Sequence, residues 1–193
     1  MIPKLSLIIS FYNKPDLLQR VLESVALQTM PNFEVVIADD GSKAEAVEQI
    51  ERMKKQFAFP IIHIWQEDDG WQKNRILNKA VVAARGEYLV FIDGDCLLER
   101  HFLEEHYAGR KQGEVVTGRR VLLTPRTTQQ LLAQSVSKNS FGVCLFFRLL
   151  GETLFRHQKT QMEQMIRLPQ WLRRLLVKER KRYILGSNFS LYK

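Results

Sequence analysis

Two aspartates separated by one glycine, Asp93-Gly94-Asp95, follow directly after an apolar run. The run Tyr88–Ile92 shows no alternation with polar residues, which predicts a strand buried on both faces. Carboxylates at positions i and i+2 can face one side of a turn, and a glycine between them lets the backbone turn tightly. Two hard oxygen ligands suit Mg²⁺ or Mn²⁺. The alternative is an Asp-Gly turn that only connects two elements.

A second acidic cluster, Asp39-Asp40-Gly41-Ser42, follows another apolar run, Phe33–Ala38. Both clusters are therefore expected at the carboxyl ends of strands. In open α/β sheets, ligands bind at this edge. If the two strands are neighbours, their acids converge on one crevice, so together the clusters favour a binding site over two simple turns.

Apolar runs alternate with helical patterns through the first half of the chain. This order predicts a parallel sheet with right-handed crossovers. We expect Asn13 to cap the first helix, with Pro15 in its first turn, and Ser42 and Glu45 to form a capping box for the second. The expected strands are Leu5–Phe11, Phe33–Ala38, Phe59–Trp65 and Tyr88–Ile92, and the second and third helices cover residues 43–56 and 72–85.

The second half is expected to complete the same α/β domain with more helix. Residues 1–123 are predicted to form the ligand-binding part, and residues 124–193 a helical, basic segment. The patterns predict helices over residues 99–112 and 127–164, and strands over residues 114–123 and 184–192.

Charge is unevenly distributed along the 193 residues. Net charge is +8, and residues 167–183 hold seven basic residues and one acid. The remainder is close to neutral, which argues against a nucleic-acid-binding groove. The two cysteines, Cys96 and Cys144, match no metal or redox spacing and are expected to be reduced. The amino terminus does not resemble a signal peptide, and no apolar run reaches the roughly 18 residues of a membrane span.

The basic segment 167–183 has two interpretations. On a helix, Trp171, Leu172, Leu175 and Leu176 would form an apolar stripe opposite the basic residues. That pattern is typical of a helix lying on an anionic membrane surface. It is equally typical of a solvated helix that packs its leucines on the domain.

No glycine-rich dinucleotide-binding or Walker A motif is present, so other groups would have to bind any phosphates. In order and spacing, four linked segments over residues 4–98 resemble the family 2 glycosyltransferases of GT-A fold. A more distant resemblance, to members that build bacterial surface polysaccharides, comes from the final GSNFSLYK. The first two segments are SLIISFYNKPDLLQRVLESVALQT and FEVVIADDGS. The other two, around Asn74-Arg75 and the final DGD, lie within DGWQKNRILNKAVVAARGEYLVFIDGD.

The resemblance implies a Rossmann-like, mostly parallel sheet flanked by helices, and a nucleotide-sugar site. Ser10 and Tyr12 fall in the loop that wraps the nucleotide. Tyr12 would stack on the base, unless it only caps the first helix. Asp40 would accept the imide N–H of a base, commonly uracil. Asp69 and Arg75 match positions that help hold the nucleotide, although Arg75 sits in an altered order and is otherwise a surface residue.

For the acidic turn, the resemblance implies that Asp93 reaches the ribose or a metal-bound water. Asp95 would ligate the Mg²⁺ or Mn²⁺ that bridges the donor phosphates. A phosphatase of the haloacid dehalogenase type also uses D-x-D, but on its first strand. Nucleotidyl transfer needs a glycine-rich amino-terminal loop, which is absent here.

The implied activity is an inverting transfer of a sugar from a nucleotide diphosphate, expected to be a UDP-sugar, to a growing glycan. Lipopolysaccharide or capsule, or a lipid-linked acceptor, is expected, on the cytoplasmic side and at the inner face of the membrane. The family continues into an acidic segment with the general base. No acid of this chain matches it, so we expect a truncated form. The alternative is a donor-binding partner subunit that is catalytically incomplete.

Overall fold

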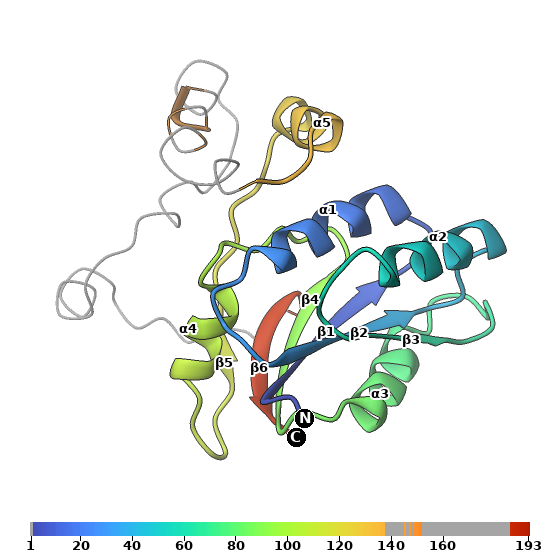
Figure 1. The fold of residues 1–193 in the computed structure, drawn as a ribbon, viewed down its shortest axis with the longest axis vertical. Helices are drawn as coiled ribbons and strands as arrows, with labels where there is room; N and C mark the ends of the chain where they lie inside the picture. The colour runs from blue at the N-terminus through green and yellow to red at the C-terminus, as the bar shows by residue number, and fades with distance from the viewer. Residues whose placement is uncertain (1, 138–144, 146, 148, 152–185) are drawn as a thin grey trace, which may run out of the picture.

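The computed structural model describes residues 2–137, 145, 147, 149–151 and 186–193. They form a six-stranded sheet in the order β3-β2-β1-β4-β6-β5 (Figure 1). The first four strands run parallel, and β6 runs antiparallel to both of its neighbours. The strands are β1 Leu5–Phe11, β2 Phe33–Asp39, β3 Ile61–Trp65, β4 Tyr88–Asp93, β5 Val116–Thr117 and β6 Asn188–Tyr192.

Helices cover both faces of the sheet. Helices α1 and α2 lie on one face and α3 on the other (Figure 1). Each face has its own apolar core, so the fold is three-layered and α/β as predicted. The helices are α1 Pro15–Ala26, α2 Ala44–Lys54, α3 Lys73–Ala83, α4 Phe102–Ala108 and α5 Pro125–Ala133.

Strand β1 explains why apolar residues run on without alternation. Leu7 and Ile9 belong to the core cluster that includes residues of α1 and α2, whereas Ile8 belongs to the cluster under α3. Both faces are therefore buried. Ser10 shares its face with Ile8, since side chains alternate along a strand. The serine consequently emerges on the side of the sheet where α3 begins.

The predicted helix caps are wrong. Lys14 and Lys43 occupy the N-cap positions of α1 and α2, and neither helix has a side-chain cap. Asn13 instead adopts a left-handed φ of 48°, and its backbone N–H donates to Ser42 Oγ at 2.9 Å. Its own Oδ1 accepts from the backbone N–H of Lys43 at 2.9 Å. These polar groups join two loops, so they are not available to cap a helix.

The region after β4 has shorter elements than predicted. Helix α4 starts at Phe102, three residues late. The backbone N–H of Leu103, which a helix starting at Glu99 would bond to the Glu99 oxygen, donates instead to Gln28 Oε1 at 3.0 Å. The strand predicted over residues 114–123 is wrong apart from β5. Its partner β6 begins at Asn188, and there the ladder ends.

Strand β6 fills the gap between β4 and β5. Phe189 stacks on Phe91 with ring centroids 4.5 Å apart, and Tyr192 meets Tyr88 edge-on. A buried polar network continues into α4, where His106 bonds Ser190 Oγ at 2.7 Å and Asn188 Oδ1 at 3.0 Å. The predicted strand at this position is confirmed from Asn188 onward.

Several predictions fall where the structure gives no description. The expected helix over residues 127–164 is seen as α5, which ends at Ala133. Most of the rest of that range lies outside the described residues, as do the basic segment 167–183 and Cys144. Within the described part of the chain, no helix has the length and apolar character needed to cross a membrane.

Candidate functional site

Asp93 lies at the carboxyl end of β4 and accepts two hydrogen bonds on one oxygen. Ser10 pairs with it across the β1–β4 ladder, and its Oγ donates to Asp93 Oδ1 at 2.9 Å. Lys73, the first residue of α3, places its Nζ 2.5 Å from the same oxygen. The side chains of the lysine and the aspartate are 25% and 31% exposed, so this ion pair is open to a ligand.

Asp40 follows β2 and also contacts the start of α3. Its Oδ2 accepts from the backbone N–H of Gln72 at 3.0 Å, and its Oδ1 from Gln66 Nε2 at 2.7 Å. Because Gln72 and Lys73 are consecutive, both acidic clusters meet the same end of one helix. Strands β2 and β4 are not neighbours, because β1 lies between them, so the condition set from sequence for convergence is not met. The two acids meet instead through the start of α3.

The loops around this place are held together by Tyr12. Its hydroxyl donates to Asp68 Oδ2 at 3.1 Å, and this hydrogen bond to a carboxylate raises the pKa of Tyr12. Tyr12 is 49% exposed, so its side chain is accessible to a ligand. The neighbouring acid, Asp69, is exposed and contacts Gln72 through its backbone oxygen. Asp68 is therefore the acid that fixes this loop.

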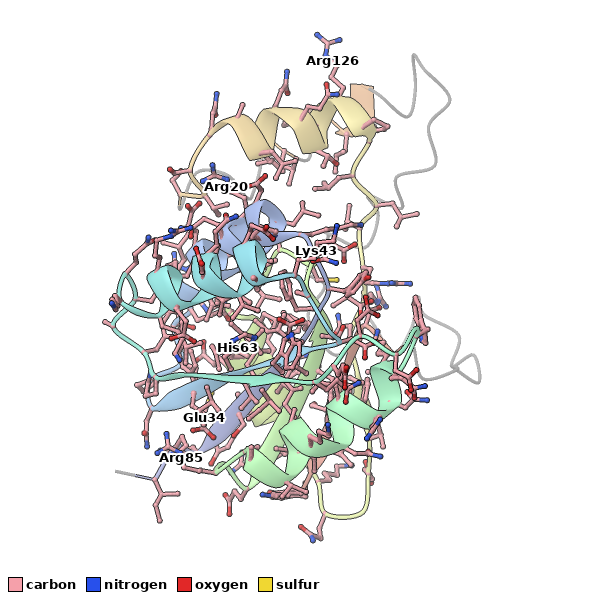
Figure 2. All side chains as sticks on the ribbon, turned by 90° about the vertical axis from the view of Figure 1, so that its right-hand side faces the viewer. Arg20, Glu34, Lys43, His63, Arg85 and Arg126 are labelled. Atoms are coloured by element: carbon pink, nitrogen blue, oxygen red, sulfur yellow. The ribbon has the colours of Figure 1, made fainter. Side chains whose placement is uncertain are left out.

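Asp39 stabilises the turn that carries Asp40. The residue is fully buried, and its carboxylate accepts from the backbone N–H of Ser42 at 2.9 Å and from His63 Nε2 at 3.0 Å. His63 is a residue of β3, and its side chain lies between the sheet and α2 (Figure 2). A buried carboxylate with two donors holds the loop that presents Asp40, so Asp39 is a structural neighbour of the site.

Asp95 is exposed on the turn after Asp93. The thiol of the next residue, Cys96, is largely buried, and burial raises its pKa to about 11, so it is neutral. Among the described residues, no group of three or more His, Cys, Asp or Glu side chains could hold a metal ion. Two carboxylates with an otherwise open shell nevertheless fit Mg²⁺ or Mn²⁺, which bind through few carboxylates, water and substrate phosphates.

Three residues of this arrangement were missed from sequence: Gln66, Gln72 and Lys73. Arg75, which was expected to help hold the nucleotide, lies exposed on α3 two residues after Lys73. The only local signal for Lys73 was its place at a helix start. Its ion pair joins residues twenty positions apart, and nothing in the local pattern predicts it.

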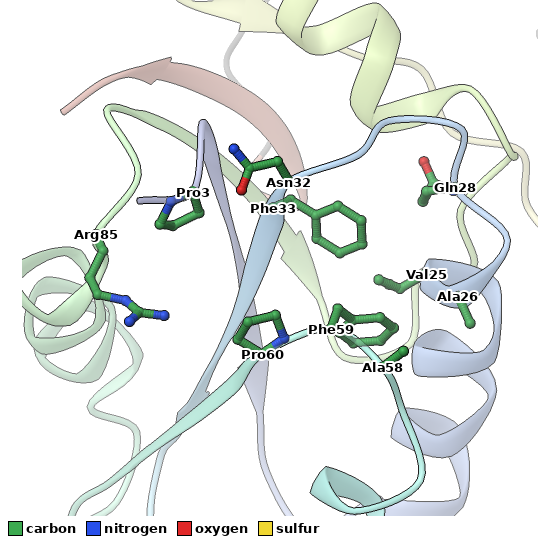
Figure 3. A pocket seen from close by; sticks show the side chains of 10 residues that line it. All are labelled: Pro3, Val25, Ala26, Gln28, Asn32, Phe33, Ala58, Phe59, Pro60 and Arg85. Atoms are coloured by element: carbon green, nitrogen blue, oxygen red, sulfur yellow. The ribbon is translucent and has the colours of Figure 1, made fainter. Parts of the chain in front are cut away.

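A pocket of about 500 Å³ lies at the opposite edge of the sheet (Figure 3). It is bordered by residues at the starts of strands, including Phe33 and Pro60, and by Arg85. Arg85 also pairs with the buried Glu34 at 2.7 Å (Figure 2). The acidic clusters are at the carboxyl ends of the strands, so this pocket is separate from the candidate site.

Comparison with known proteins agrees with this arrangement. The model of the family described as Glycosyl transferase family 2 matches residues 6–176. The glycosyltransferase EpsH of Bacillus subtilis is 39% identical over 105 residues, which cover 53% of this chain and 29% of EpsH. The poly(ribitol-phosphate) beta-glucosyltransferase of Bacillus spizizenii is 28% identical over 113 residues, which cover 58% of this chain and 18% of that protein.

A solved structure shares the fold. It is a mannosyltransferase from Pyrobaculum calidifontis in complex with GDP-mannose and Mn²⁺, with a TM-score of 0.55 and 23% identity over 67% of this chain and 38% of that one. The matched part spans less than a third of the length of the curated relatives named above. Since the family model covers most of the sequence, the chain belongs to glycosyl transferase family 2 and has the GT-A fold.

Proposed function

We propose that this protein transfers a sugar from a nucleotide diphosphate donor, a UDP-sugar, to a hydroxyl group of a growing surface glycan. The observation that carries the proposal is the meeting of Asp40 and Asp93 at the first residues of α3. In a family 2 member, this place lies at the edge of the sheet where ligands bind.

Asp40 is the proposed reader of the base. An ionised carboxylate only accepts hydrogen bonds, and each oxygen has two lone pairs. The side-chain amide of Gln66 donates to one oxygen and the backbone N–H of Gln72 to the other. These bonds fix the carboxylate and leave acceptor capacity for a ligand. An imide N–H of uracil would satisfy it, whereas the ring nitrogen N3 of cytosine is itself an acceptor. The half-exposed Tyr12 ring would stack on the base.

Asp93 and Asp95 would hold a divalent cation, with Ser10 orienting Asp93. When bound, Mg²⁺ or Mn²⁺ would stabilise the negative charge that grows on the nucleoside diphosphate as it leaves. The protein's own contribution is to fix these carboxylates beside α3. We propose inversion, by direct attack of the acceptor hydroxyl with a general base, and the described residues do not identify that base.

The acceptor is proposed to be a growing surface glycan, such as lipopolysaccharide or capsule, or a lipid-linked precursor of one. EpsH and the poly(ribitol-phosphate) beta-glucosyltransferase support a transferase, and the name of the second gives a polymer as its acceptor. Contact of the basic segment 167–183 with an anionic membrane at the cytoplasmic face stays a prediction.

Calorimetric titration of UDP, GDP, CDP and ADP, each with and without Mn²⁺, tests the donor half of the proposal. We expect UDP to bind in a metal-dependent manner and the other three to bind more weakly. Asp95→Ala should remove the dependence on Mn²⁺ while the fold, checked by thermal melting, is kept. Retained Mn²⁺-dependent affinity in that variant would refute the metal role of Asp95. UDP binding without sugar transfer to any glycan would favour the non-catalytic partner subunit.

A further inference from the structure

The Lys73–Asp93 ion pair lies where the proposed donor phosphates and metal would bind. Asp93 Oδ1 accepts from Lys73 Nζ at 2.5 Å, and Ser10 Oγ donates to the same oxygen. Both charged side chains are partly exposed, so neither is locked inside the protein. The pair therefore neutralises an acid that is expected to face a divalent cation.

A cation arriving at Asp93 would repel the ammonium group of Lys73. Like charges that share one carboxylate oppose each other, whereas a diphosphate next to the metal offers the lysine a new anionic partner. Lys73 has four flexible side-chain carbons and three donors, so it can exchange partners without movement of the backbone.

We propose that Lys73 binds the phosphates of the donor, and that without metal and donor it forms an ion pair with Asp93 in place of the metal. This inference rests on the proposed function. It assigns to Lys73 the phosphate contact that the sequence suggested for Arg75. Side chains two residues apart on a helix point in directions about 160° apart, so Arg75 cannot share the direction of Lys73 toward Asp93.

One variant, Lys73→Met, should change the affinities for Mn²⁺ and for UDP in opposite directions. Lys73→Met removes the competitor for Asp93, so Mn²⁺ alone should bind about two- to fivefold more tightly, the scale of a partly exposed ion pair. The same variant loses a charged donor to phosphate, so UDP with Mn²⁺ should bind about 10- to 100-fold more weakly. Lys73→Arg should restore most of the UDP affinity. Lys79→Met, at an exposed lysine further along α3, is the matched control, expected to resemble wild type in both titrations.

Calorimetry of the full chain, first with Mn²⁺ alone and then with UDP and Mn²⁺, measures both effects. Unchanged UDP affinity in Lys73→Met would overturn the inference, and so would a loss of Mn²⁺ binding in that variant. In either case, metal-dependent UDP binding by wild type leaves the proposed function standing. Absence of such binding in wild type for all four diphosphates would overturn the proposed function, and this inference with it.

Discussion

Asp40 shows how one residue combines a structural and a proposed recognition role. Its carboxylate is held from two sides by the amide of Gln66 and the backbone N–H of Gln72. Gln66 is itself almost fully buried, and its Oε1 has no hydrogen-bond partner among the described residues. The amide is therefore held mainly through its donor end, which points at Asp40 and supports a fixed acceptor for the base.

Asp40→Asn tests this recognition role without changing the shape of the side chain. The amide group would put a donor opposite Gln66 or Gln72 and would lose the charge that favours an imide N–H. We expect the preference for UDP over CDP, measured by calorimetry, to fall about tenfold or more. Glu67→Gln, an exposed acid in the neighbouring loop, is the control. Unchanged selectivity in Asp40→Asn would exclude Asp40 from the base pocket.

At the residue scale, sequence predicts acids better than their partners. Asp40 and Asp93 stand out because an apolar run stops abruptly at each, and the positions of the strands then follow from burial. The donors that fix them were not predictable, because Gln66, Gln72 and Lys73 reach the acids across 20 to 32 residues. The roles of Tyr12, Asp69 and Asp95 as ligand contacts stay predictions.

At the element scale, the site depends on two loops that touch at Gly41. This residue has a φ of +93°, and a Cβ added to it would lie 2.5 Å from the backbone Cα of Asp68. The loop after β2 can therefore approach the loop after β3 only if residue 41 has no side chain. This contact keeps Asp68 close enough to hold Tyr12.

Gly41→Ala should consequently destabilise the protein by about 3 kcal/mol, from backbone strain and steric overlap together. It should also weaken nucleotide binding, because the two loops must separate. Gly70→Ala is a matched control: Gly70 also has a positive φ, +71°, but an added Cβ would meet no atom of the described part of the chain within 4 Å. Strain alone should cost that variant about 1 kcal/mol. Urea unfolding measures both values, and equal losses would contradict the steric argument.

Elements were predicted well where one or both of their faces are apolar. They were predicted poorly where contacts with distant parts of the chain determine where an element begins or ends. Strands β1, β2 and β4 were found because their buried runs are long and end at polar turns. The outer strand β3 is only partly buried and begins at Ile61, two residues later than predicted. The caps at Asn13 and Ser42 were wrong because these residues bond each other across 29 positions. A strand of ten residues was predicted around β5, but a strand extends only as far as its partner does, and β6 offers β5 just two pairs.

At the scale of the whole molecule, buried His106 links stability to pH. Burial lowers its pKa to about 4, from an ordinary value of 6.5. Between these values the unfolded chain binds the proton and the folded chain does not. The contribution of the neutral His106 to the free energy of unfolding is therefore fully present above pH 6.5. It is lost as the pH falls toward 4, by about 3 kcal/mol.

Urea unfolding of wild type and His106→Gln at pH 7, 6 and 5 measures this effect. We expect the free energy of unfolding to fall with pH in wild type and to change much less in the variant. Glu34 does not confound the comparison. Burial would raise its pKa, but hydrogen bonds from Ser6 and Arg85 lower it below 4.5, so its contribution is lost only at lower pH. Parallel pH profiles for the two proteins would show that His106 does not titrate as described.

The position of β6 also sets the order in which the molecule can be completed during translation. About 95 residues separate the end of β4 from the start of β6, which is about 5 to 20 s of synthesis on the ribosome. Until then the side of β4 that later pairs with β6 presents unpaired backbone N–H and C=O groups. Such edges recruit strands from other chains. The nascent protein therefore passes through an aggregation-prone stage, and chaperone protection during that interval would help its yield.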